Sequence, residues 1–299
     1  MSTTNELKNR IEGIGDIRKI TKAMYLIASR KLSKAKADMD RTRPYYEALK
    51  NEIHRIFRVD AMIESPYFYP PGSAGVLHGP CGFLVITADK GLSGAYNQNV
   101  IKETLRVMEE HSGDEHRLFV VGEYGRRYFS LHGYEIEKSF LYTAQNPTMD
   151  RAREIASTLL NQYDEGKIVR LYVIYTDMTG PVEEQTRCQR LMPFHRADFG
   201  AVEGEREVKE PFEFIPSLGD VLHSIIPSYL AGFIYSALTD SFCSEQNARM
   251  LAMDSASSNA DDLISRLTVE YNHERQGTIT RQITEMSSGV RAIRRKKEE

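Results

Sequence analysis

The residues best suited to chemistry lie in a glycine-containing segment, Thr87 to Gly94, which reads Thr-Ala-Asp-Lys-Gly-Leu-Ser-Gly after a predicted strand. Glycines after a strand can hold phosphate, because backbone N–H groups at a helix start point at the ligand. The segment lacks the GxxxxGK[ST] and GxGxxG patterns of nucleotide-binding loops. We therefore interpret it as a tight turn between a strand and a helix.

Other catalytic signals are weak as well. The eight His residues include no HExxH motif and no His/Cys pairing with metal spacing, and there is no GxSxG elbow. Three widely spaced cysteines, Cys81, Cys188 and Cys243, are too few for a disulfide framework or a four-Cys zinc site. We expect a reducing compartment, and neither catalytic residues, metal nor cofactor in this chain.

The net charge of −3 hides a basic N-terminal arm. Residues 1–58 carry 14 basic and seven acidic residues, whereas residues 59–205 and 206–299 are both net acidic. The segment from Ile17 to Lys36 has seven basic residues and no acidic one. Such a segment suits a negative partner, although a solvated helix face is the alternative.

Two long amphipathic helices are predicted at the two ends of the chain. Apolar residues recur every three or four positions over 1–58, which is the pattern of a coiled coil. Within 215–293 the same spacing appears at 218–233 and again at 279–293, with an Ala- and Ser-rich stretch between them. Pro44 predicts a kink or local break near Arg43. The simplest way to bury both stripes is to pair the helices in antiparallel orientation.

Between them, residues 80–197 predict an α/β (Rossmann-like) head domain. Short apolar runs at 83–87, 117–121 and 169–175 alternate with helical stretches at about 97–111, 122–132 and 149–163, and 189–193 is a possible further strand. This alternation favours a mostly parallel sheet. Residues 198–216 are expected to be irregular. No apolar run reaches 18 residues, so we expect no membrane span.

Several motifs resemble those of the gamma subunits of F-type ATP synthases. Lys19-Ile20-Thr21-Lys22-Ala23-Met24 resembles the family's N-terminal signature, and 89–94 is similar to its Asp-Arg-Gly-Leu-Cys-Gly turn, with Lys90 and Ser93 as departures. Segments 244–253 and 271–285 resemble its C-terminal signatures. The motifs cover the whole chain in the expected order.

The resemblance implies a non-catalytic central-stalk, or rotor, subunit. Its paired helices would lie in the cavity of the hexamer of alpha and beta subunits, and its head would contact the epsilon subunit and the membrane c-ring. Ion flow would turn ring and stalk and so couple to ATP synthesis or hydrolysis on beta. The implied location is peripheral, on the cytoplasmic face of a bacterial cell membrane.

The resemblance also implies partner-contact residues. Basic residues suit the family's acidic loop on beta, two apolar residues match positions that pack against beta, and an Arg-Gln pair matches a catch that hydrogen-bonds a beta loop. The basic residues are Lys22, Arg30, Lys31 and Lys90. The apolar residues are Met24 and Leu26, and the Arg-Gln pair is Arg275 and Gln276.

The C-terminal tail departs from the family. Residues 294–299 read Arg-Arg-Lys-Lys-Glu-Glu, where the family ends in short apolar residues. Burying such charge in an apolar sleeve has a large desolvation cost. We expect the tail to protrude from the hexamer and to be disordered.

Two other functions remain open from the residues alone. One is a nucleotide-dependent α/β enzyme with helical arms, and the other is a basic coiled-coil adaptor for nucleic acid. The adaptor lacks a reader motif, and Tyr25 is the only aromatic residue in its basic run.

Overall fold

The computed structural model describes residues 4–59, 65–69, 77–141, 144–178, 184–195, 214–215 and 217–298. By their contacts the residues form two compact units, Met1–Ile27 with Met250–Glu299, and Ala28–Arg249. The two long helices α1 (Thr4–Val59) and α5 (Leu218–Glu298) each contribute residues to both units.

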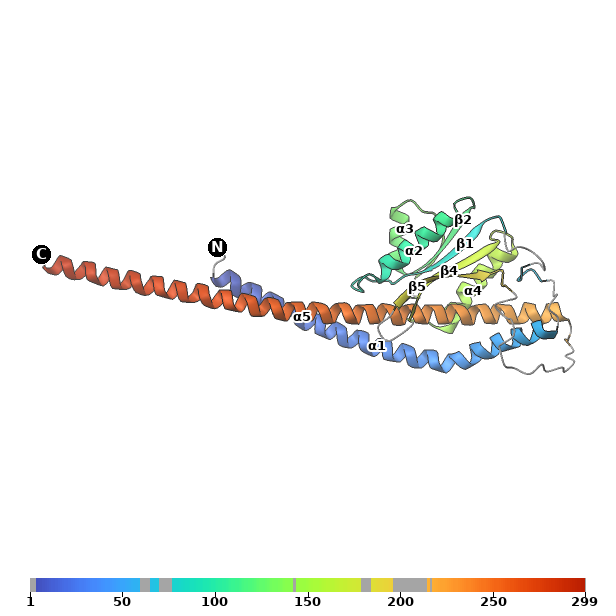
Figure 1. The fold of residues 1–299 in the computed structure, drawn as a ribbon, viewed down its shortest axis with the longest axis horizontal. Coiled ribbons are helices and arrows are strands. Elements are labelled where there is room, and N and C mark those ends of the chain that lie inside the picture. Colours follow the sequence, from blue (N-terminus) through green and yellow to red (C-terminus); the bar gives the residue numbers. More distant parts are fainter. Residues whose placement is uncertain are drawn as a thin grey trace. The chain divides into compact units, whose positions relative to one another are not determined.

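The unit formed by residues 28–249 contains a five-stranded sheet (Figure 1). Its strands run in the order β3-β2-β1-β4-β5. Their bounds are β1 Cys81–Ile86, β2 His116–Val121, β3 Ile136–Phe140, β4 Arg170–Met178 and β5 Glu184–Met192. All neighbours pair in parallel except β4 and β5, which are antiparallel. The predicted mostly parallel α/β sheet is therefore confirmed.

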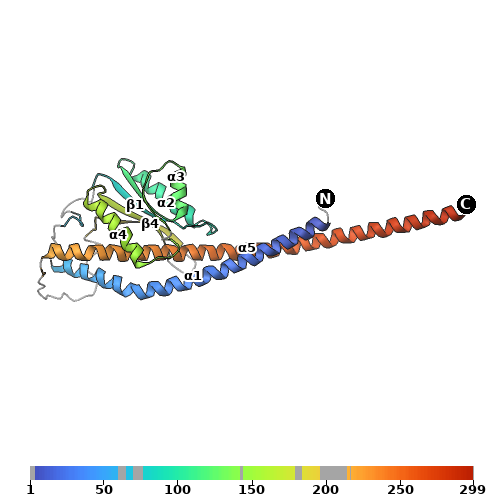
Figure 2. The same ribbon diagram turned by 180° about the vertical axis from the view of Figure 1, so that it is seen from behind.

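Helices cover both faces of this sheet because its central strands are apolar on both sides. Phe83 and Val85 of β1 pack with α2 (Tyr96–Glu110) and with Phe129 of α3 (Glu123–Leu131). Leu84 and Ile86 face the other way, into a core shared with α4 (Met149–Asp164), α1 and α5. Figure 2 shows these layers from behind.

Helices α1 and α5 run antiparallel, as the sequence predicts. In the sheet-containing unit, Ile53 and Ile56 of α1 are buried with Leu222 and Ile226 of α5. Further along the same unit, Leu32 and Ala35 pack against Phe242 and Cys243. These contacts close the sheet core with apolar side chains from both ends of the chain.

In the other unit, α1 and α5 form a helix pair with a narrow buried seam. Leu7 and Thr21 of α1 are buried, as are Met253, Ala260 and Leu267 of α5. An ion pair joins Arg18 Nη1 to Asp261 Oδ1 at 2.5 Å. A seam this narrow leaves most of both helix surfaces exposed.

Several sequence predictions need correction. The strand β3 was not predicted, and β5 is longer than the predicted 189–193. Helix α1 is continuous through Pro44, so the local break that was one of the two predicted outcomes is absent. Thr42 Oγ1 donates to the carbonyls of Asp38 and Met39 in the preceding turn. Most of the predicted irregular stretch 198–216 lies outside the described residues.

The expected disorder of the tail is also wrong. Helix α5 continues to Glu298, so residues 294–298 are helical. No helix breaker follows Gly289, and Arg, Lys and Glu are good helix formers.

One helix passes a length and composition test for a membrane span. It is the part of α5 from Leu218 to Arg291, which contains an 18-residue window with a mean hydropathy of 1.4. The window mixes apolar residues with uncharged polar ones, which is why it is not an unbroken apolar run. Of that window 56% is buried inside the protein, and buried core helices pass the same test.

Candidate subunit-interaction surfaces

The helix pair of residues 4–27 and 250–298 carries five of the eight predicted contact residues. Lys22, Arg275 and Gln276 are exposed, Leu26 is 61% exposed and Met24 is partly buried. Arg275 lies 14 residues beyond Asp261, which places it about 20 Å along α5 from the Arg18–Asp261 ion pair. Because Lys22 follows Arg18 in the opposite direction, the structure does not bring Lys22 together with Arg275 and Gln276.

The same helix pair exposes many large apolar side chains. Single exposed apolar residues are ordinary, but a concentration of them marks an interaction surface. On α1 they are Ile17, Ile20, Leu26 and Ile27. On α5 they are Leu251, Leu263, Val269, Ile279, Ile283, Met286 and Val290. This surface suits enclosure by protein partners, and Arg275 and Gln276 are exposed on the same stretch of α5.

In the sheet-containing unit, the glycine-containing segment is a turn held by its own backbone and side chains. Asn97 Oδ1 accepts the N–H of Ala88 at 3.0 Å, and its Nδ2 donates to the carbonyl of Lys90 at 3.5 Å. Asp89 Oδ1 accepts the N–H of Glu123 at the start of α3. These bonds use the amide of Asn97 and one carboxylate oxygen of Asp89 to hold the turn, which agrees with the interpretation as a strand-to-helix turn.

An ion pair on α5 anchors this turn. Arg249 Nη2 lies 2.5 Å from Glu245 Oε1 and donates to the carbonyl of Gly91 at 3.1 Å. The side chains of Glu245 and Arg249 are only 6% and 12% exposed. Burial raises the pKa of Glu245, while Arg249 and Lys31 both favour its charged form.

Two of the predicted contact residues, Lys90 and Lys31, lie near this ion pair. Lys90 is exposed at the tip of the anchored turn, and Lys31 is exposed on α1 within electrostatic range of Glu245. Arg30, also exposed, precedes it on α1. Lys31 and the turn that carries Lys90 therefore both lie near the segment of α5 that holds this ion pair.

Sequence reasoning missed the structural roles of Glu245 and Arg249. Their i,i+4 spacing on a helix was the available signal for an ion pair. No sequence pattern indicated that the pair is buried or that Arg249 hydrogen-bonds to the carbonyl of Gly91. Asp114 and Arg170 form a second largely buried pair, at 2.5 Å, which was not predicted either.

A partly buried carboxylate, Asp240, lies on α5 near Asp177 of β4. Burial and the nearby carboxylate of Asp177 raise the pKa of Asp240 to about 6. Ser236 donates to Asp240 at 3.4 Å, and Arg43 of α1 also favours its charged form. Asp177 has its own partner, Arg187, at 3.1 Å. The Asp240 carboxylate is therefore destabilised at neutral pH.

Replacing Asp240 by Asn should stabilise the protein at pH 7.5 and not at pH 4. Between the unfolded pKa, near 3.9, and the folded pKa, near 6, the native state binds more protons than the unfolded state, so this group lowers stability as pH rises. We expect the free energy of unfolding to increase by about 1–2 kcal/mol at pH 7.5. Urea unfolding at both pH values measures it.

The matched control is Asp254→Asn, which changes an exposed carboxylate on the same helix. Because Asp254 is exposed, its replacement should change the free energy of unfolding by at most about 0.5 kcal/mol. If Asp240→Asn were no more stabilising at pH 7.5 than at pH 4, the assignment of a destabilised carboxylate would be wrong.

Metal and catalytic chemistry find no support in the described part of the chain. There, no group of three or more His, Cys, Asp or Glu side chains could hold a metal ion. Burial raises the pKa of all three thiols, those of Cys81, Cys188 and Cys243, which keeps them protonated and poorly nucleophilic. The described residues offer exposed apolar and basic side chains as contact surfaces.

An α/β domain joined to a pair of long helices with exposed apolar and basic surfaces defines a protein-interaction subunit. The profile of a family described as ATP synthase matches residues 3–293. The ATP synthase gamma chain of Caldanaerobacter subterraneus is 41% identical over 289 residues, covering 94% of this chain and 97% of that one. The gamma chain of Ruminiclostridium cellulolyticum is 38% identical over 296 residues, or 96% and 98% of the two chains. The chain belongs to the family of ATP synthase gamma chains.

Solved structures share the fold. A chain from the central stalk and c-ring of the Tetrahymena thermophila mitochondrial ATP synthase has a TM-score of 0.62 and 24% identity, covering 80% of this chain and 99% of that chain. A chain from the Euglena gracilis mitochondrial ATP synthase, in an assembly of OSCP, F1 and c-ring, has a TM-score of 0.65 and 16% identity, covering 99% and 96%. The predicted fold class, an α/β head with long antiparallel helices, is thereby confirmed.

Proposed function

We propose that this chain is the non-catalytic rotor of an F-type ATP synthase. The helices of 1–58 and 215–293 form its shaft and residues 80–197 form its head. The shaft turns inside the hexamer of alpha and beta subunits, and the head contacts the epsilon subunit and the membrane c-ring. The chain thereby couples ion flow to ATP synthesis or hydrolysis, peripherally on the cytoplasmic face of a bacterial membrane.

The observation that carries the proposal is the exposed apolar surface of the helix pair. Residues such as Ile20 (59%), Val269 (70%) and Met286 (72%) cannot remain in water without cost. A surrounding protein cavity would cover both helices at once. Family membership supports the same partners, because relatives of this chain are ATP synthase gamma chains.

The basic residues add a contact that tolerates movement. Lys22, Arg30, Lys31 and Lys90 are all exposed, and we assign them to the acidic loop of beta. Charge attraction acts over several ångströms and needs no fixed geometry, which suits surfaces that slide past one another. Met24 and Leu26 supply the apolar contact with beta, and Arg275 and Gln276 supply the catch.

Reconstitution tests this function. Cognate alpha and beta subunits are mixed with and without the full chain, and ATP hydrolysis is measured. We expect the chain alone to show no turnover and no tight nucleotide binding, and the mixture to gain ATPase activity. Turnover by the chain alone would favour the enzyme alternative, and salt-sensitive binding to random duplex DNA would favour the nucleic-acid adaptor.

The catch is tested in the same assay by replacing Arg275 and Gln276 together with Ala. We expect turnover to fall about tenfold, the loss of roughly one charge-assisted hydrogen bond, while the complex still elutes intact from a sizing column. His273→Ala, an exposed change two residues away, is the control and should retain full turnover. Unchanged turnover of the double variant would remove this assignment.

A further inference from the structure

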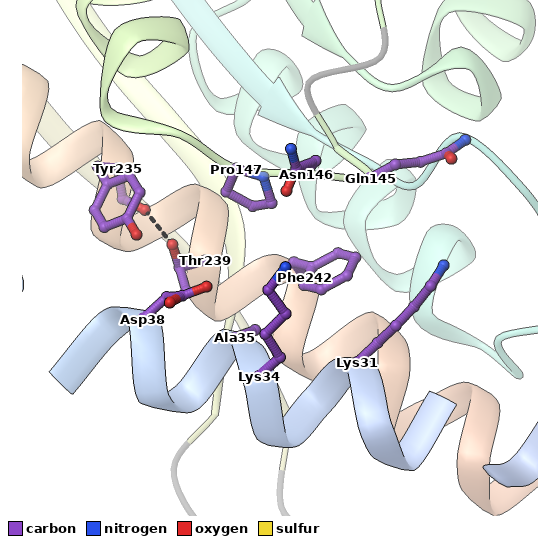
Figure 3. A pocket seen from close by; sticks show the side chains of 10 residues that line it. All are labelled: Lys31, Lys34, Ala35, Asp38, Gln145, Asn146, Pro147, Tyr235, Thr239 and Phe242. Carbon is purple, nitrogen blue, oxygen red and sulfur yellow. Dashed lines mark hydrogen bonds between the residues drawn. The ribbon is translucent and has the colours of Figure 1, made fainter. Parts of the chain in front are cut away.

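A cavity of about 230 Å³ lies within the sheet-containing unit, between α1, α5 and the segment before α4 (Figure 3). Ten residues from these three parts of the chain line it. Pockets for drug-sized ligands are about 300–1,000 Å³, so this cavity suits a smaller molecule. Lys31, which we also assign to the acidic loop of beta, lies on its rim, whereas the turn at 89–94 and the proposed catch do not contribute to it.

The rim of the cavity is basic and polar. Figure 3 shows the side chains of Lys31 and Lys34 extending from α1 toward Gln145 and Asn146. All four residues are exposed. Among the described residues, neither lysine has a carboxylate oxygen within 4.0 Å, although Lys31 acts on Glu245 over a longer distance. The rim therefore offers two ammonium groups and two carboxamides that a ligand can engage.

The cavity has one acidic residue in its lining, Asp38. Its carboxylate lies 3.3 Å from Arg41 Nη2. The positive charge of the two lysines thus exceeds the negative charge of the lining. An anion is favoured over a cation.

The inner wall is apolar. Ala35 and Phe242 are buried, and Pro147 is partly buried at the opposite side. Thr239 Oγ1 is also buried and donates to the carbonyl of Tyr235 at 2.8 Å, so its hydrogen is already used. A flat apolar group can pack beside Phe242 and Pro147, and aromatic pairs add to the gain from burial.

We propose that this cavity binds a small aromatic phosphate. Its ring packs on Phe242 and Pro147, and its phosphate accepts hydrogen bonds from Lys31 and Lys34. Two ammonium groups match the double charge of a phosphate monoester better than the single charge of a carboxylate. The amide groups of Gln145 and Asn146 supply further donors at the rim. A bound ligand joins α1, α5 and the segment before α4.

Isothermal titration of the full chain with phenyl phosphate tests the proposal. We expect saturable 1:1 binding with a dissociation constant of about 1 mM or below, which is typical of a ligand of this size. Inorganic phosphate and benzoate are the comparison ligands, and both should bind at least about fivefold more weakly. If inorganic phosphate bound as tightly as phenyl phosphate, the proposed contact of the ring with Phe242 and Pro147 would be wrong. If benzoate bound more tightly than phenyl phosphate, the proposed preference for a phosphate group would be wrong.

Variants at the rim separate this cavity from other basic surfaces. Lys34→Gln should weaken phenyl phosphate binding about tenfold, and Lys34→Arg should retain most of it. Lys36→Gln is the matched control, because Lys36 is exposed on the same helix and does not line the cavity. Absence of saturable binding, or equal loss with Lys34→Gln and Lys36→Gln, would overturn the proposal. The titration uses the chain alone, so its outcome is independent of the reconstitution assay.

Discussion

Replacing Arg249 by Met should lower the free energy of unfolding by about 3–5 kcal/mol. Arg249 lies 2.5 Å from Glu245, whose side chain is 6% exposed. Without Arg249, the Glu245 carboxylate stays buried without its strongest partner, or takes up a proton. The carbonyl of Gly91 also loses its donor. The midpoint of urea unfolding, followed by far-UV circular dichroism, measures the loss.

A double-variant cycle shows whether the loss comes from the stranded carboxylate. Adding Glu245→Gln to Arg249→Met removes the charge and should recover more than half of the lost stability, because replacing both members of a buried pair is often nearly neutral. Lys8→Met is the control for an exposed pair, since Lys8 and Glu12 are 61% and 66% exposed. It should cost about 0.5 kcal/mol or less. A similar small loss for Arg249→Met would contradict the expectation.

The ion pair also connects stability with the proposed partner surface. Lys90 is at the tip of the turn that Arg249 holds through Gly91. A turn released from α5 presents Lys90 with less order, and an ordered charge contributes more to a contact than a mobile one. We therefore expect Arg249→Met to bind the beta subunit more weakly than the wild type. The binding is measured under conditions in which the variant is still folded.

The long elements of the fold were predictable because their patterns are strong. Helices α1 and α5 repeat apolar residues over many turns, and β1, β2 and β4 contain compact apolar runs. The strand β3 was not predictable from its pattern, because it is an edge strand of the sheet. Its sequence, Ile136-Glu-Lys-Ser-Phe140, contains exposed charged residues. Edge strands lack the continuous apolar pattern that identifies central ones. The tail is helical although it is highly charged, because Arg, Lys and Glu are good helix formers.

The candidate surfaces were only partly accessible from sequence. Exposure of Lys22, Arg30 and Lys90 follows from their charge, and the helical period places Leu26 off the buried seam. The bond from Arg249 to Gly91 joins residues 158 positions apart, and no local pattern reports such a contact. The cavity under Lys34 likewise needs three distant segments to meet. What sequence cannot supply here is tertiary proximity.

Replacing Gly122 by Ala should abolish stable folding of the sheet-containing unit. Gly122 has φ +94° before α3, and a Cβ there would lie 2.2 Å from the backbone oxygen of Thr87 at the end of β1. Thr87 cannot retreat, because its N–H and its hydroxyl both donate to Val121 at 2.9 Å. Its Oγ1 also accepts the N–H of Gly125 at 3.0 Å. The overlap therefore falls on backbone fixed by the β1–β2 pairing. We expect a loss of more than about 4 kcal/mol, seen as loss of soluble folded protein or a much lower urea midpoint.

Alanine variants at two other glycines distinguish the effect of the steric overlap from the effect of the positive φ alone. Gly133 also has a positive φ, +79°, but a Cβ there meets nothing within 4 Å, so Gly133→Ala should cost about 1–2 kcal/mol. Gly113 has open space and no positive φ, so Gly113→Ala should change stability by at most about 0.5 kcal/mol or increase it slightly. The order of losses should be Gly122, Gly133, Gly113. If Gly122→Ala were no more damaging than Gly133→Ala, the close approach of the β2–α3 turn to Thr87 would not constrain the fold. The larger loss is expected because it requires the end of β1 to move, and Asp89 and the turn that carries Lys90 follow directly after it.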